Sequence, residues 1–237
     1  MCKSKQYKIL SIDPGLSNIG YSCSIFDTGT NKLEVQKTGI LHATKAVKKK
    51  EGIDIYGSRL LSLNEIESTF KRIIKSFEPD YVVSEDAFYC SRFPNAYSAL
   101  LLSIYIIERT LYYMYEKDHT VKETARVLYK LAPRNIKKLA SGNSLSYKSN
   151  MSEALVNNPD ISFVLKEDQT YESLISSLTE HEVDAISGGF AFAKSTLPEL
   201  TINEIISNEV LSTEEIAIQE ELSKSLKKSK KRKKKEK

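Results

Sequence analysis

Asp13 ends an apolar run at residues 7–12 and is followed at once by Pro14 and Gly15. The run is rich in β-prone residues, so it predicts a strand that carries one carboxylate at its tip. Pro14 and Gly15 then break the strand without a bulky side chain, which lets a phosphate-like group approach the backbone. A carboxylate fixed at such a position is a good metal ligand. An ordinary Asp-Pro-Gly turn is the alternative interpretation.

A second acid, Glu85, ends the short buried strand predicted for residues 81–85. A helix with apolar residues at helical spacing is predicted for 58–77, directly before it. A strand, a helix and a further strand in this order place the two strands parallel to each other. We therefore expect Asp13 and Glu85 to emerge at neighbouring strand ends of one sheet edge.

Further acids open a helix predicted for residues 180–193. With 3.6 residues per turn, His181 and Asp184 point from the same helix face, and so do Glu180 and Asp184. The small residues Gly188 and Gly189 would let this helix pack closely on a sheet. The helix can therefore bring its ionisable residues close to the strands.

The remaining elements follow from periodicity and turn residues. The sequence predicts strands at 19–27, 33–41 and 125–131 and helices at 95–116 and 133–140. Helix 95–116 is apolar on more than one face, so we expect a second copy of the chain to cover it in a homodimer.

Charge is concentrated at one end of the 237 residues. Residues 224–237 hold ten Lys or Arg and one Glu, whereas the whole chain carries a net charge of only +4. We expect a disordered Lys-rich tail there that attracts nucleic acid without sequence preference. A nuclear address and a solubilising end are the alternatives. Residues 42–54 also hold four lysines, which indicates a mobile loop, either a solvated connector or a DNA contact.

Neither a membrane span nor disulfides are expected. The longest apolar stretch, 99–107, is too short to cross a bilayer, and the first residues have no apolar signal core. The three cysteines lack paired metal spacing, which suits a reducing compartment. We expect an intracellular protein, cytoplasmic or nucleoid, or nuclear if the host is eukaryotic.

Several motifs occur together along the chain. These are Ile12-Asp13-Pro14-Gly15 with Gly20, Pro79-Asp80-Tyr81 leading to Glu85 and Phe88, the run Asn95 to Leu100, Pro133-Arg134 with Lys137, Lys138, Gly142 and Lys148, and His181 with Asp184 and Ala185. Taken together, they resemble the motifs of one family, the RuvC-type Holliday junction resolvases of the RNase H-like nucleases. The resemblance spans residues 7–194 and is specific only through the joint occurrence of its motifs.

This resemblance implies an α/β fold with an RNase H-like mixed five-stranded sheet flanked by helices. The nuclease domain would span 1–197, followed by an acidic helical extension at 198–223 and the disordered tail at 224–237. The helix after Asn95 lacks the basic residues that family members usually carry near its start, so the grip on DNA is expected to differ.

The resemblance also implies a metal site. Asp13, Glu85 and Asp184 match three of the family's metal-binding carboxylates, and His181 falls on the fourth position. Such a set would hold two Mg²⁺ ions per active site, and the softer His181 ligand predicts that Mn²⁺ is accepted at least as well. If His181 is instead a helix residue bonded to a backbone carbonyl, Glu180 takes its place as ligand.

Other matches imply contacts to DNA. Lys137 and Lys148 match catalytic basic positions near the scissile phosphate, and simple neutralisation of the DNA backbone is their alternative role. Arg134 and Lys138 belong to the same basic segment. Phe88 matches an aromatic residue that stacks on bases at the crossover, with a core position as its alternative.

The expected function is that of a homodimeric, metal-dependent endonuclease that resolves four-way junctions and other branched DNA by paired symmetric nicks. The process would be recombination, repair or viral genome processing. The alternatives are a junction-binding scaffold without activity and another RNase H-like nuclease, such as one that cuts RNA–DNA hybrids. An actin-like ATPase is disfavoured because nine glycines and 237 residues offer no second copy of the domain.

Overall fold

The computed structural model describes residues 4–48, 52–89, 91, 94–142, 148–165 and 167–201, with the backbone alone for 148–150. The chain divides into two compact units, Met1–Lys194 and Ser195–Lys237. The described part of the second unit, 195–201, is helical. The rest of the predicted acidic extension and the whole Lys-rich tail lie outside the described residues.

A mixed sheet forms the centre of the first unit, with the strand order β5-β4-β1-β2-β3-β6. Its antiparallel part is β1 (Gln6–Asp13), β2 (Ile19–Asp27) and β3 (Lys32–Leu41). Parallel strands extend it on both sides: β4 (Tyr81–Glu85) and β5 (Leu128–Leu131) beyond β1, and β6 (Ile161–Phe163) beyond β3. The expected α/β fold is confirmed. The sheet has one strand more than the five expected, because β6 is too short to show a sequence pattern.

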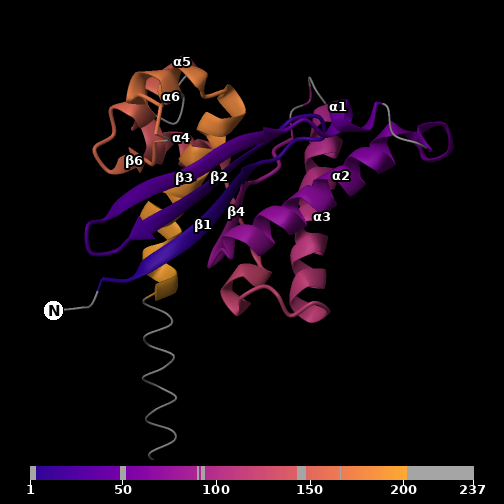
Figure 1. The fold of residues 1–237 in the computed structure, drawn as a ribbon, viewed down its shortest axis with the longest axis horizontal. Coiled ribbons are helices and arrows are strands. Elements are labelled where there is room, and N and C mark those ends of the chain that lie inside the picture. Colours follow the sequence, from indigo (N-terminus) through magenta and orange to yellow (C-terminus); the bar gives the residue numbers. More distant parts are fainter. Residues whose placement is uncertain are drawn as a thin grey trace, which may run out of the picture. The chain divides into compact units, whose positions relative to one another are not determined.

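Helices connect and cover these strands (Figure 1). The described helices are α1 (Ala43–Val47), α2 (Ile53–Phe77), α3 (Pro94–Glu116), the 3-10 turn η1 (Glu123–Arg126), α4 (Pro133–Ser141), α5 (Lys148–Val156) and α6 (Tyr171–Ser177). A further helix begins at residue 180 and occupies the first unit to its end at 194. Of the helices in the described ranges, none combines the length and apolarity that crossing a membrane requires.

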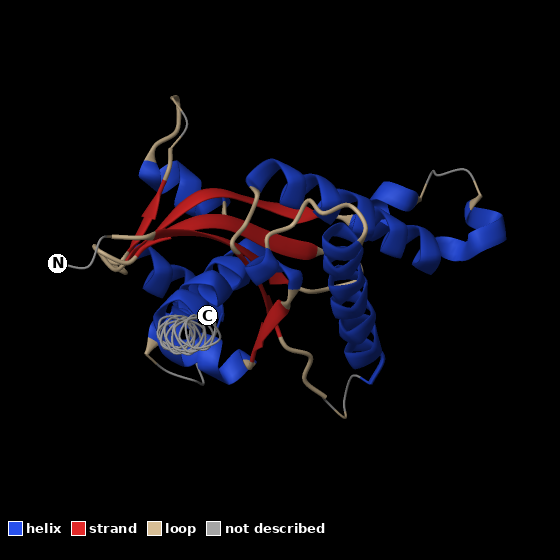
Figure 2. Cartoon of the chain, turned by 90° about the horizontal axis from the view of Figure 1, so that it is seen from below, coloured by secondary structure: helices blue, strands red, loops and turns tan. Residues whose placement is uncertain are grey.

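The two faces of the sheet are buried by different helices (Figure 2). On one face, Leu10 of β1 lies in a core with Phe70 of α2 and Ile107 of α3. On the other face, Tyr81 of β4 packs against Phe192 of the helix 180–194, with ring centroids 5.3 Å apart. Each fully buried side chain of this size stabilises the fold by about 1.5–3 kcal/mol. The helix 180–194 is therefore anchored directly on the central strands.

Three local predictions were wrong in detail. Residues 42–54 are not simply a loop, because α1 forms within them, and its Ala43 and Val47 are completely buried one helical turn apart. The helix predicted from residue 58 begins at Ile53 and continues past a break at Gly57, whose φ of 76° is outside the helical range. The strand predicted for 125–131 is confined to β5, since η1 occupies its first residues.

Candidate active site

The alternation of side chains along β1 determines where Asp13 points. Leu10 and Ile12 face the core with α2 and α3. Ser11 faces the helix 180–194, because a Cβ added at Gly188 would lie only 2.8 Å from its Oγ. Residues two apart in a strand share a face, so Asp13 follows Ser11 onto the side of this helix. The small residues of the helix thus do what the sequence predicted and bring it close to the sheet.

Glu85 reaches the same edge through β4. The strands β1 and β4 run parallel, in a register whose last pair directly precedes Asp13 and Glu85. Tyr81 packs on the helix 180–194, and Glu85 lies four residues after it, so the carboxylate points to that same face. The predicted juxtaposition of two acids at neighbouring strand ends agrees with this register.

His181 meets Asp13 across the sheet edge. The Nδ1 atom of His181 lies 2.6 Å from Oδ2 of Asp13. Because a carboxylate only accepts hydrogen bonds, Nδ1 carries the proton and donates it. Gly20, the partner of Asp13 in the β1–β2 pair, makes the approach possible. A Cβ at Gly20 would lie 2.0 Å from the carbonyl oxygen of His181, so a larger residue would push the helix away.

Most of the predicted site residues line one cavity of about 260 Å³. It lies between the end of β1, the end of β4, the start of α4 and the first turn of the helix 180–194. Its lining includes six of the residues singled out from the sequence and the alternative ligand Glu180: Asp13, Glu85, Phe88, Lys137, Glu180, His181 and Asp184.

The ionisable groups around this cavity are mostly acidic. Five carboxylates line it, with one lysine ammonium and one imidazole: Asp13, Glu85, Asp86, Glu180, Asp184, Lys137 and His181. Such an excess of negative charge in one hollow favours a bound cation or a shared proton, since either relieves the repulsion. The cavity therefore has the electrostatics of a cation site.

The donor set suits a divalent metal, although no closed ligand group is formed. Within the described ranges, no three His, Cys, Asp or Glu side chains stand together as a group that could hold a metal ion. The bond from His181 Nδ1 to Asp13 is nevertheless the kind that orients a ligating histidine, which commonly donates its other ring proton to a carboxylate. The residues fit a metal by their chemistry and their convergence, and the metal itself is a proposal.

The basic residues predicted to contact DNA are divided between the cavity and its surroundings. Lys137 of α4 lines the cavity and is partly buried. Arg134 and Lys138 of the same helix are exposed and lie outside the lining. Lys148 begins α5, but its side chain lies outside what the structure describes.

Sequence reasoning assigned no role in the site to several residues of the cavity, although one of them, Leu100, ends a motif of the resemblance. Asn18 lines it from the β1–β2 turn, and its Oδ1 lies 2.9 Å from Nδ1 of His42. Leu100, Ile136 and Met151 supply an apolar wall from three different helices. Only Asp86 had a usable sequence signal, since it is an acid directly after a strand-ending acid. The apolar wall could not be read from the sequence, because buried aliphatic residues look alike wherever they pack.

Aromatic side chains stand beside the cavity. Phe88 lines it and is 54% exposed, so the alternative of a core position is wrong. Tyr89 is 66% exposed and its ring contacts that of Tyr97 edge-on, at 5.6 Å. Exposed aromatic rings next to a charged cavity are suited to stacking on unpaired bases.

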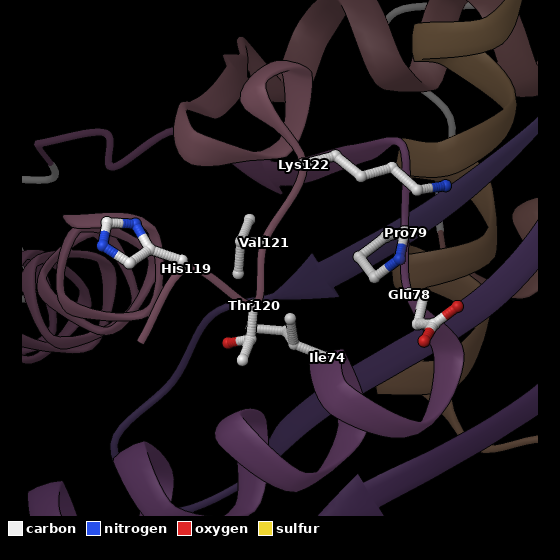
Figure 3. A pocket seen from close by; sticks show the side chains of 7 residues that line it. All are labelled: Ile74, Glu78, Pro79, His119, Thr120, Val121 and Lys122. Atoms are coloured by element: carbon white, nitrogen blue, oxygen red, sulfur yellow. The ribbon is translucent and has the colours of Figure 1, made fainter. Parts of the chain in front are cut away.

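A second hollow, of about 310 Å³, shares no lining residue with this site (Figure 3). It lies where α2 ends and β4 begins, whereas the candidate site lies where β4 ends. Seven residues line it: Ile74, Glu78, Pro79, His119, Thr120, Val121 and Lys122. Its lysine, Lys122, already donates to Asp80 at 2.6 Å. None of the predicted site residues is found there.

The strand order and the helices on both faces of the sheet define the class, which is the RNase H-like fold. Among solved structures, Thermus thermophilus RuvC in complex with a Holliday junction substrate is similar over 79% of this chain and 93% of its own, at 13% identity and a TM-score of 0.55. The yeast mitochondrial Holliday junction resolvase is similar over 78% of both chains, at 17% identity and a TM-score of 0.52.

The Fowlpox virus resolvase, solved with its substrate Holliday junction DNA, overlaps less well, with a TM-score of 0.46 at 17% identity over 80% of this chain and 99% of its own. No family model matches the sequence, and no curated protein matches it either. At these identities the likeness is one of fold. The chain has the fold of the RuvC-type Holliday junction resolvases, as the sequence motifs predicted.

Proposed function

We propose that this protein is a metal-dependent endonuclease that cuts branched DNA, four-way junctions above all, by paired nicks. One observation carries the proposal: Asp13, Glu85, His181 and Asp184, predicted from scattered motifs, line a single cavity in a chain with the junction-resolvase fold. Thermus thermophilus RuvC, whose fold this chain shares, was solved in complex with a Holliday junction substrate. Neither the fold nor the cavity alone would support so specific a function.

In this proposal, Asp13, Glu85, Asp184 and His181 hold two Mg²⁺ or Mn²⁺ ions. When bound, these ions would supply the activation of a water molecule and the stabilisation of the leaving oxygen. The protein's own part is to position the ligands: β1 and β4 fix two carboxylates side by side, and the helix 180–194 brings the other two ligands to them. The apolar wall of Ile136 and Met151 limits the access of bulk water on one side.

The basic residues are proposed to hold the DNA backbone. Lys137 is placed to meet the phosphate nearest the acidic groups, because it lines the same cavity. Arg134 and Lys138 would contact neighbouring phosphates from the exposed face of α4. Lys148 and the Lys-rich tail, residues 224–237, are assigned to DNA from the sequence alone.

Phe88 is proposed to stack on a base at the open crossover. We expect Phe88→Ala to weaken junction binding by about 1–3 kcal/mol, the usual contribution of one stacked base. Fluorescence anisotropy with a labelled four-way junction measures this loss. Tyr56→Ala is the matched control, since Tyr56 is also an exposed aromatic, 60% accessible, but lies on α2 outside the cavity. Equal affinities of wild type and Phe88→Ala would contradict the stacking role.

A homodimer fits the outer face of α3. Leu101, Tyr105 and Tyr112 are 43%, 58% and 55% exposed and form one stripe at helical spacing. The opposite face of α3 is buried in the core, so this helix is apolar on two sides, as the sequence indicated. A second copy related by a two-fold axis would cover the stripe and place two active sites on one junction.

We expect Tyr105→Glu to convert this dimer into a monomer and paired nicks into single nicks, because a charge would be buried in the interface. Sedimentation equilibrium gives the mass, and a supercoiled cruciform plasmid distinguishes a nicked circle from a linear product. Tyr56→Glu serves as the control. A wild-type protein that is monomeric at the concentrations used for cleavage would contradict this part of the proposal.

The proposed function is tested with a panel of labelled substrates: a four-way junction, a fork, a linear duplex and an RNA–DNA hybrid, each with Mg²⁺ or Mn²⁺. We expect the junction to be cut fastest. Tight junction binding without cutting under either metal would favour the inactive scaffold. Faster cutting of the RNA–DNA hybrid than of the junction would show that this protein has a different nuclease activity.

A further inference from the structure

Glu182 lies on the first turn of the helix 180–194 but does not line the candidate active site. It lines a different hollow, of about 400 Å³, together with residues of β3, β6 and α6. His181, the residue before it, lines the active-site cavity. Two consecutive residues of this helix turn therefore line different hollows: His181 lines the active-site cavity, and Glu182 lines the hollow beside β3, β6 and α6.

The carboxylate of Glu182 caps the helix that carries His181. Its Oε2 accepts hydrogen bonds from the backbone N–H of Thr179 at 3.0 Å and from the Thr179 hydroxyl at 2.8 Å. In return, the backbone N–H of Glu182 donates to Thr179 Oγ1 at 3.4 Å. This reciprocal pair is a capping box, which satisfies donors that a helix start would otherwise leave without partners. The bonds fix where the helix begins.

The other oxygen of Glu182 reaches the sheet. Its Oε1 accepts a hydrogen bond from the Thr38 hydroxyl of β3 at 2.8 Å. A capping box needs no such contact, so this bond is an additional tie between the helix start and the strand. Burial raises the pKa of the Tyr21 phenol of β2, and Cys23 and Glu182 raise it further.

The hydrogen bonds of Glu182 help to determine the position of His181, the residue before it. Its carbonyl oxygen rests over Gly20 of β2, at a distance that leaves no room for a Cβ. Its ring donates to Asp13 of β1. The turn is thus held against β2 by close packing and against β3 by Glu182 and Thr38, and both contacts determine how the imidazole meets Asp13.

We infer that Glu182, through its bond to Thr38, is a positioning residue that holds the His181 imidazole against Asp13. Glu182 does not contact the reacting groups. The predicted effect on cleavage rests on the proposed function, whereas the effect on the His181 ring does not. The capping box alone would stabilise the helix, but it would not locate the helix on the sheet.

The test separates the tie to β3 from the cap. Thr38→Val removes only the hydroxyl that bonds Glu182, Thr38→Ser restores it, and Glu182→Met keeps the side-chain length while removing both acceptor oxygens. Thr30→Val, in the exposed β2–β3 turn, is the control for the substitution itself. The first readout is the Nδ1–H proton of His181 by NMR in the metal-free protein, assigned by its absence in His181→Asn. The chain has only three histidines, so the spectrum is simple.

We expect the Nδ1–H resonance to be present in wild type, Thr38→Ser and Thr30→Val, and to be broadened or lost in Thr38→Val and Glu182→Met. The bond to Asp13 slows exchange of this proton with water, and a displaced ring loses that protection. Cleavage of the four-way junction should fall by about 10–100-fold in Thr38→Val, as for other residues that orient a metal ligand, with junction affinity unchanged.

An unchanged Nδ1–H resonance in folded Thr38→Val and Glu182→Met would overturn the inference, whatever the rates of cleavage. If wild type cuts no DNA, the proposed function fails, and the NMR comparison still decides whether Glu182 positions His181. The two failures are therefore distinguishable.

Discussion

Replacing Asp13 by Asn is expected to abolish DNA cleavage while leaving the fold and junction binding intact. Asn has nearly the same shape, so the packing at the end of β1 is preserved, but it lacks the negative charge that would hold a divalent cation. Asp13 is also the acceptor of the His181 bond, and it is only 13% exposed. Losing a preorganised charged group of an active site lowers the rate by on the order of 10³-fold.

The measurement is a single-turnover rate with a labelled four-way junction, beside the dissociation constant for the same junction without metal. Asp168→Asn is the matched control, because Asp168 is an exposed acid outside the cavity. We expect the control to cut at the wild-type rate. An Asp13→Asn variant that cuts as fast as wild type would show that Asp13 has no role in cleavage. Its motif would then be an ordinary Asp-Pro-Gly turn.

The second prediction concerns which residue, His181 or Glu180, is the fourth metal ligand. We expect His181→Ala to lower the cleavage rate by about 10²-fold, the upper end of what is lost when a metal site loses an orienting contact. Glu180→Gln should change the rate little. Both side chains line the cavity, but His181 is the one bonded to Asp13, whereas Glu180 is exposed at the helix start.

The reverse result, a large loss in Glu180→Gln and a small one in His181→Ala, would assign the ligand to Glu180. A third variant sharpens the comparison. His181→Asp supplies a fourth carboxylate, and because carboxylates suit the harder ion, the ratio of rates with Mg²⁺ and Mn²⁺ should move towards Mg²⁺. Rates measured across metal concentrations separate weaker metal binding from a slower chemical step.

Much of the site could be predicted because its residues lie where the chain makes sharp local changes. Asp13 precedes a Pro-Gly turn, Glu85 follows a short apolar run, and His181 and Asp184 open a helix of small residues. Strand ends and helix starts leave clear sequence patterns. The parallel arrangement of β1 and β4 agrees with the long helix that precedes β4, since parallel strands need a crossover connection, which is usually a helix.

Other features could not be predicted, because they depend on partners distant in sequence. The bond between Glu182 and Thr38 joins residues 144 positions apart, and Glu182 by itself looks like an ordinary surface acid. The short strand β6 has three residues, too few for a pattern of alternation. The helix α1 forms in a lysine-rich segment because its two apolar residues find a buried site, which local propensity does not show.

The exposed stripe of α3 illustrates an intermediate case. Its excess of apolar residues was visible in the sequence, and the structure identifies which of them the core leaves uncovered. What covers them is a proposal from the fold and from the two-fold character of a four-way junction. If Tyr105→Glu has the mass of a monomer and makes only single nicks, the exposed stripe of α3 is needed for paired cleavage.

The central claim is that this chain cuts four-way junctions with metal ions held at the end of β1 and β4. Its most direct test maps the cut positions on a junction labelled on each of its four strands in turn, with wild type and Asp13→Asn at equal concentration. We predict nicks at symmetric positions on two opposing strands, dependent on Mg²⁺ or Mn²⁺ and absent from the variant. Cuts that persist in Asp13→Asn, or a wild type that leaves all four strands intact with either metal, would contradict the claim.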